Sequence, residues 1–117
     1  MSESIVKTKS FELAVSGVNF YKYIVSEKKE YVMSKQFLRS ITSVGANVRE
    51  AVNAQSKPDF IHKLAIAQKE CDETIYWLEL LKATAYISEN EFNSLHGQSN
   101  EVLKIIRSII ITSKKNS

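Results

Sequence analysis

The feature that most limits the fold of this chain is a heptad rhythm in its second half. Between Phe60 and Ala85, apolar or small side chains recur at alternating steps of four and three residues. This spacing places them on one face of an α-helix, whereas successive residues of a β-strand point to opposite faces. The face consists of Phe60, Leu64, Ala67, Cys71, Thr74, Leu78, Leu81 and Ala85. A long helix is therefore predicted from about residue 57 to residue 86.

Capping residues indicate where two helices begin. Ser56 can cap the long helix, and Pro58 is tolerated in a first turn because its missing N–H has no helical partner to lose. Ser88 and Glu91 have the spacing of a capping box, in which each side chain accepts a hydrogen bond from a backbone N–H. They predict a further helix over about residues 89–113. Its expected core face is Phe92, Leu95, Val102, Ile106 and Ile109.

Two more helices are predicted before residue 56, on either side of the charged segment SEKKE at residues 26–30. The first spans about residues 10–26, with an expected core face of Phe11, Ala14, Val18, Tyr21 and Val25. The second spans about residues 32–54, with an expected core face of Phe37, Ile41, Val44, Val48 and Ala51 or Val52. Only three glycines and one proline occur among 117 residues, which suits long helices with short connections. The sequence therefore predicts an all-α protein of one domain, residues 1–117, folded as an antiparallel up-down-up-down four-helix bundle.

Composition disfavours several classes of protein. No apolar run approaches the roughly 18 residues of a membrane span, because Arg107 interrupts the longest one. The residues after Met1 lack the apolar segment of a signal peptide, and the single cysteine, Cys71, excludes an intramolecular disulfide. A cytoplasmic protein without membrane partners is therefore expected. Its net charge of +3 is compatible with acidic partners such as RNA but does not require them.

The sequence offers little catalytic chemistry. Di-iron sites in helix bundles use Glu-x-x-His pairs, and neither His62 nor His96 follows a glutamate at that spacing. Cys71 lies on the heptad core face, where a thiol behaves as a small inert hydrophobe. The surroundings of Gly45 lack the Lys-Ser/Thr ending of a phosphate-binding loop. We therefore expect a protein that is not an enzyme and that carries no metal and no cofactor.

The second predicted helix contains poor helix formers in the segment SVGANVREA, residues 43–51. Gly45 lies about 40° from the core direction, where the lack of a side chain lets a neighbouring helix approach. About 130° from the core lies a second stripe of small or uncharged residues, unlike the long charged side chains of a solvated face. This stripe consists of Gln36, Ser40, Ser43, Asn47 and Ala54.

The third predicted helix has a matching surface, where Ile66, Trp77 and Leu80 alternate with Glu70 and Glu73. Two interpretations are open. Trp77 covers the edge of a wide bundle, or the second and third helices form a subunit interface, which a tryptophan outside the core often anchors. We favour the subunit interface. Its candidate residues are Gln36, Arg39, Ser40, Ser43, Asn47, Glu50, Ile66, Glu70, Glu73 and Trp77.

Charge favours contact between the third helix and the N-terminal half. Residues 1–58 hold nine basic and five acidic side chains, and residues 59–82 hold three and five. We expect Arg39 to form a buried ion pair with Glu70 or Glu73, because a planar guanidinium suits a desolvated carboxylate. The alternative is an exposed pair that adds little stability. Contact within one chain and contact between two chains are both compatible with this pairing.

These residues resemble the signature of a known family. The pattern has a Gln and an Arg-Ser, then Ser-x-Gly/Pro-Ala-Asn-x-x-Glu, then Ser-x-x-Asp/Glu-Phe, then glutamates along the third helix. Its positions are filled by Gln36, Arg39, Ser40, Ser43, Gly45, Ala46, Asn47, Glu50, Ser56, Asp59, Phe60, Glu70 and Glu73. Together with the ISENEF entry to the fourth helix, they resemble the four-helix-bundle family labelled S23 ribosomal protein, whose members are encoded in intervening sequences of bacterial 23S rRNA genes. The resemblance covers about residues 10–113.

The resemblance extends to the accessory proteins of diversity-generating retroelements, which form homopentamers and bind RNA and a reverse transcriptase through basic surface. It implies a non-enzymatic homopentamer whose candidate partners are further copies of the chain, RNA and a reverse transcriptase or other protein. The alternative is a protein–protein adaptor or scaffold that binds no nucleic acid. The candidate nucleic-acid contacts are Lys22, Lys28, Lys29, Lys35, Arg49, Lys104 and Arg107.

Overall fold

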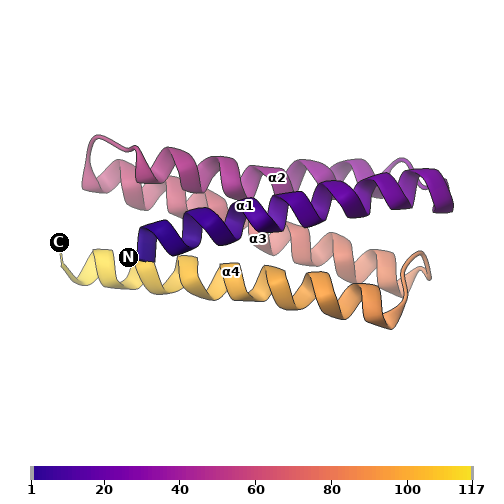
Figure 1. Ribbon diagram of the computed structural model, residues 1–117. Helices are drawn as coiled ribbons and strands as arrows, with labels where there is room; N and C mark the ends of the chain where they lie inside the picture. Colours follow the sequence, from indigo (N-terminus) through magenta and orange to yellow (C-terminus); the bar gives the residue numbers. More distant parts are fainter. Residues whose placement is uncertain (1, 117) are drawn as a thin grey trace.

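The computed structural model describes residues 2–116, and every regular element in that range is a helix. The elements are α1 (Ser2–Tyr23), the π-helix η1 (Ile24–Lys28), α2 (Met33–Val52), α3 (Lys57–Ala83) and α4 (Glu89–Lys115). Successive helices run in opposite directions, and the bundle measures 47 × 21 × 19 Å (Figure 1). Each helix packs against its neighbour in sequence, and α4 returns to α1. The predicted antiparallel four-helix bundle is confirmed.

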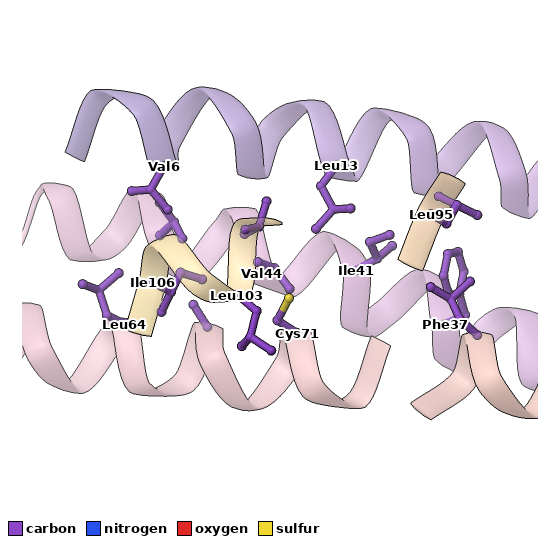
Figure 2. Close-up of a cluster of buried hydrophobic side chains, with 14 of the residues drawn as sticks. Val6, Leu13, Phe37, Ile41, Val44, Leu64, Cys71, Leu95, Leu103 and Ile106 are labelled. Atoms are coloured by element: carbon purple, nitrogen blue, oxygen red, sulfur yellow. The ribbon is translucent and has the colours of Figure 1, made fainter. Parts of the chain in front are cut away.

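All four helices contribute to one core, part of which Figure 2 shows. On α2 and α3 the predicted core faces are buried, from Phe37 to Ala51 and from Leu64 to Leu81. Ala85, expected on the α3 face, is exposed because the helix has already ended. A membrane span would require a longer apolar stretch than any of these helices offers.

The core face predicted for the first helix is wrong. α1 begins at Ser2 rather than near residue 10, and the predicted member Phe11 is 56% exposed. The buried side of α1 instead consists of Val6, Ser10, Leu13 and Gly17, and Ile24 of η1 continues it. Both stripes have helical spacing, but the buried one contains the small residues that a close contact with α2 requires. Apolar character alone therefore selected the wrong side of this helix.

Two glycines allow α1 and α2 to approach each other. A Cβ added to Gly17 of α1 would lie 2.5 Å from Cγ2 of Ile41, which is fully buried in α2. A Cβ added to Gly45 of α2 would lie 3.2 Å from the backbone oxygen of Ser10. Gly45 therefore has the structural role expected from the sequence, and α1 is the helix that approaches it.

The predicted ends of α2, α3 and α4 differ from the observed ones by at most three residues. The largest difference is at the end of α3, where Ala85 adopts a left-handed conformation with φ 67°. The backbone N–H of Tyr86 donates to the oxygen of Leu81 at 2.9 Å, and that of Ala85 donates to the oxygen of Lys82 at 3.0 Å. These two bonds form a Schellman motif, which ends the helix without a glycine.

The helix starts that were predicted from capping residues are confirmed. Ser56 Oγ accepts a hydrogen bond from the backbone N–H of Asp59 at 3.2 Å. Ser88 and Glu91 complete both hydrogen bonds of the capping box, at 2.7 and 3.2 Å.

Substitution of the glycines tests the close contact between α1 and α2. We expect Gly97→Ala to stabilise the protein by up to about 1 kcal/mol, because Gly97 lies in α4 with nothing within 4 Å of an added Cβ. Gly17→Ala gains the same helix propensity but must displace buried Ile41, which costs about 1–3 kcal/mol. Gly17→Ala should therefore unfold at lower urea concentration than Gly97→Ala, with both measured at one protein concentration. Equal midpoints for the two variants would contradict the close contact.

Candidate functional site

The candidate interface residues lie along the contact line between α2 and α3, here called the α2–α3 seam. Arg39 Nη2 lies 3.2 Å from Glu70 Oε1, Arg39 Nη1 donates to Glu70 Oε2 at 3.4 Å, and Arg39 also pairs with Glu73. The hydrogen bond to Glu70 is the main cause that raises the pKa of Arg39. The structure thus forms both expected pairs within one chain.

The expectation that this ion pair is buried is wrong for the single chain. The Arg39 side chain is 48% exposed, although the Glu70 side chain is only 14% exposed. The reason is that Arg39 reaches the carboxylates from the outer side of α2, so its guanidinium stays in contact with solvent. An exposed pair of this kind adds little stability by itself.

Ser40 does not belong to an accessible interface. It is fully buried beneath the ion pairs, where Thr74 Oγ1 of α3 donates to its hydroxyl oxygen at 2.9 Å. Ser40 in turn donates to the backbone oxygen of Phe37 at 3.0 Å. This hydroxyl pair joins α2 to α3 inside the chain, so Ser40 cannot contact a second copy.

The rest of the small-residue stripe keeps its hydrogen bonds on its own helix. Ser43 Oγ donates to the oxygen of Arg39 at 2.6 Å, and Asn47 Nδ2 donates to the oxygen of Ser43 at 2.9 Å. Both side chains are half-buried, and Gln36 is exposed. Glu50, also exposed, pairs with Lys63 of α3 at 3.0 Å. Ser43 and Asn47 therefore form a surface of short side chains beside the ion pairs of Arg39.

Trp77 and Ile66 lie half-buried on the α3 side of the seam. The Trp77 ring packs edge-on against Tyr76, with centroids 5.1 Å apart, and also contacts the core. Among residues 2–116, its buried indole N–H has no hydrogen-bond partner. Both interpretations of Trp77 therefore keep support, since it covers the core and also leaves a polar atom for an external acceptor.

A second apolar surface was not recognised from the sequence. The stripe that was predicted to be the core face of the first helix, here called the α1 outer face, borders a groove of about 420 Å³ between α1 and α2. The groove is lined by Lys7, Phe11, Ala14, Thr42, Gly45, Ala46, Arg49 and Glu50. The Arg49 guanidinium lies 5.9 Å from the centre of the exposed Phe11 ring. The groove beside the α1 outer face thus combines an exposed aromatic ring, small residues, two basic side chains and the acidic Glu50.

Four of the candidate nucleic-acid contacts gather at one end of the bundle. Lys22 lies in the last turn of α1, Lys28 and Lys29 end η1, and Lys35 lies in the first turn of α2. All four are exposed, and within residues 2–116 none forms a salt bridge. We call this group the basic end; it lies where α1 passes into α2, at the right of Figure 1.

The other three candidates lie elsewhere. Arg49 is in the last turn of α2, at the opposite end of the bundle, and borders the α1–α2 groove. Lys104 and Arg107 are exposed on α4, and Arg107 lies 3.6 Å from Asp72 Oδ1. The structure therefore does not bring the seven predicted contacts into one site.

The basic end rests on a buried glutamate that the sequence prediction treated only as part of a charged break. Glu30 accepts hydrogen bonds from the backbone N–H groups of Val32, Met33 and Ser34 at 3.1, 3.0 and 2.7 Å, and Ser34 Oγ donates to the Glu30 backbone oxygen at 2.7 Å. Burial acts to raise the pKa of Glu30, but these hydrogen bonds outweigh it and hold the pKa below 4.5. The carboxylate thus occupies the N-terminus of α2, where negative charge is stabilised.

The cysteine and the two histidines that were considered as catalytic or metal-binding residues lie in different surroundings. Cys71 donates to the backbone oxygen of Ser99 at 3.3 Å, and burial raises the pKa of its thiol to about 12. His96 stacks on Phe92 with centroids 4.7 Å apart, while His62 is exposed on α3. No group of three or more potential ligands for a metal ion occurs among residues 2–116.

Comparison with known proteins identifies a family and finds similar solved structures. The family model described as 23S rRNA-intervening sequence protein matches residues 2–108. A crystal structure of a protein of unknown function from the S23 ribosomal protein family of Bacteroides thetaiotaomicron VPI-5482 is 56% identical in sequence and has a TM-score of 0.93. The match covers 94% of this chain and 98% of that one. None of the curated proteins in the comparison matches the chain.

The role of Glu30 can be tested through pH. Because its pKa is lowered in the fold, its contribution to stability is present above the ordinary pKa of 4.5 and is lost as pH falls through the lowered value. We expect Glu30→Gln to unfold more easily than wild type at about pH 7, by about 0.5–2 kcal/mol. The difference should shrink as pH falls to about 3 in urea titrations.

The matched control is Glu27→Gln, since Glu27 is an exposed glutamate of the same connection. It should change stability by less than about 0.5 kcal/mol. A deficit of Glu30→Gln that is equally large at both pH values would show that charge on Glu30 is not what stabilises α2.

Proposed function

Since this chain belongs to the 23S rRNA-intervening sequence protein family, we propose that it is a non-enzymatic homo-oligomer that binds structured RNA. The observation that carries the proposal is the basic end, where four exposed lysines lie at one end of the bundle and form no salt bridge in residues 2–116. The hydrogen bond from the Ser88 backbone is the main cause that lowers the pKa of Glu91, and Lys28, one of these lysines, is near enough to contribute. Lysines that contact phosphates release counterions, and this release favours binding without any need for a catalytic group.

An oligomer would repeat the four lysines of the basic end on every copy of the chain, and this repetition favours RNA binding. Four lysines on one chain give a modest site, but several copies on one particle bind a long RNA with a higher effective concentration. A homo-oligomer of the four-helix chain would therefore convert a weakly basic protein into a polyvalent one.

Two unlike surfaces support self-association. The α2–α3 seam presents Trp77 and one net negative charge, since Arg39 pairs with both Glu70 and Glu73, whereas the groove beside the α1 outer face presents Phe11 and Arg49. The net charge of the seam is complementary to that of Arg49, and both surfaces include apolar area. Because α2 borders both, they lie on adjacent sides of the bundle rather than on opposite sides. A contact between such unlike surfaces rotates each copy relative to the last, and it forms a closed ring when the rotations add up to a full turn.

The RNA proposal predicts a salt-sensitive interaction. We expect wild type to bind a structured RNA saturably at low salt, with an affinity that falls as salt rises. Lys28→Glu/Lys29→Glu should weaken binding by about tenfold or more, because it reverses two charges of the basic end. Lys114→Glu/Lys115→Glu makes the same charge change at the end of α4 and should have a much smaller effect. Filter binding or fluorescence anisotropy measures both.

Absence of saturable binding by wild type at low salt would refute the RNA proposal. That result would leave a protein–protein adaptor, which should retain its partners after nuclease treatment.

The assembly proposal predicts the mass in solution. We expect light scattering to give about five chains per particle, and we expect Phe11→Asp to yield smaller species because it places charge on the α1 outer face. Ile5→Asp is the control, because Ile5 lies on the same helix with 50% exposure but does not line the groove. A monomeric wild type, or equal effects of the two substitutions, would contradict this arrangement.

A further inference from the structure

The geometry of the basic end points to its ligand: we propose that Tyr31 is a stacking platform for an unpaired RNA base, flanked by lysines that contact the adjoining phosphates. This inference rests on the proposed RNA binding and goes further, because it names the form of RNA that is recognised. The exposed side chain of Tyr31 follows Lys28 and Lys29 after one residue, the buried Glu30, and precedes Lys35.

Tyr31 keeps its ring available. The side chain is 57% exposed, and no aromatic or cation–π contact within residues 2–116 involves it. The other exposed tyrosines are engaged. Tyr76 packs edge-on against Trp77, while Tyr23 contacts the Phe20 ring and hydrogen-bonds to Glu91. Tyr31 is therefore the exposed tyrosine that has no aromatic or cation–π contact within residues 2–116.

The backbone that carries Tyr31 is fixed on both sides. Before it, Lys29 adopts a left-handed conformation with φ 55°, which ends η1. After it, the buried Glu30 carboxylate holds the N–H groups of Val32, Met33 and Ser34. The ring is thus presented from an ordered connection, so little conformational entropy is lost when a ligand binds.

The arrangement favours an unpaired nucleotide over a duplex. In an A-form helix the bases are stacked on one another, so a protein ring cannot reach a base face. An unpaired base can stack on tyrosine, and such a contact is tolerant of sequence. The neighbouring lysines supply charge for phosphates on either side of that base. With at most four lysines at each site, the logarithm of affinity should fall with the logarithm of salt concentration with a slope no steeper than about −3 per site.

The experiment compares two RNA probes of equal length, an unpaired oligouridine and a duplex, by fluorescence anisotropy. We expect wild type to prefer the unpaired probe. Tyr31→Ala should weaken binding of that probe by about 5- to 150-fold, the loss expected for one stacked base, and should leave duplex binding unchanged. Tyr31→Phe keeps the ring and should bind as wild type does.

Val32→Ala is the matched control, since Val32 directly follows Tyr31, is 75% exposed and carries no aromatic ring. It should leave binding of the unpaired probe unchanged, and circular dichroism should show that both alanine variants keep their helices.

Three results would overturn the inference. RNA binding that is unaffected by Tyr31→Ala, or duplex binding as tight as binding of the unpaired probe, refutes the stacking platform and leaves the proposed function standing. Binding of neither probe by wild type refutes this inference, and if the structured RNA is not bound either, the proposed function is refuted with it.

Discussion

The close approach of α1 and α2 is the constraint on which the rest of the bundle depends. Gly17 and Gly45 remove side chains from the two places where the helices meet most closely. That contact decides which side of α1 faces the core, and hence which side is left for other contacts. It also places the connection between the two helices, where the lysines of the basic end lie.

The sequence predicted α2, α3 and α4 well, because their core faces are rich in apolar residues and the starts of α3 and α4 carry recognisable caps. It failed at α1, where two stripes share the helical period and the more apolar one is only half-buried, with Phe11 exposed. The buried side of α1 is marked by Ser10 and Gly17, whose small size lets α2 approach. A pattern of hydrophobicity does not detect such small residues, whereas a search for small residues that could face Gly45 could have identified the buried side of α1.

At the candidate surfaces, too, some features could be predicted from the sequence and others could not. The partners of Arg39 could be chosen from charge and helix position, because complementary side chains at matching places on neighbouring helices need no precise geometry. Whether the pair is exposed, and whether Ser40 faces inward, depends on how far α2 is rotated towards α3. The spacing of apolar residues in the sequence predicts the rotation of α2 too coarsely to decide whether one given side chain faces inward or outward. Glu30 was missed for a related reason, since a glutamate within a charged segment has no local sign that its carboxylate folds back onto the following backbone.

The π-helix at the end of α1 has a consequence for the length of the chain. A π turn contains one residue more than an α turn, so η1 behaves as a one-residue insertion in an otherwise regular helix. Deletion of an exposed residue within it, such as Ser26, would leave four residues, which in an α-helix turn through about 400°, roughly the rotation of the five-residue π segment. An ordinary helical turn could then form while Glu30 keeps its place at the start of α2. Relatives of this protein that have one residue fewer in this segment should therefore have α-helix in place of the π-helix and keep the connection that follows.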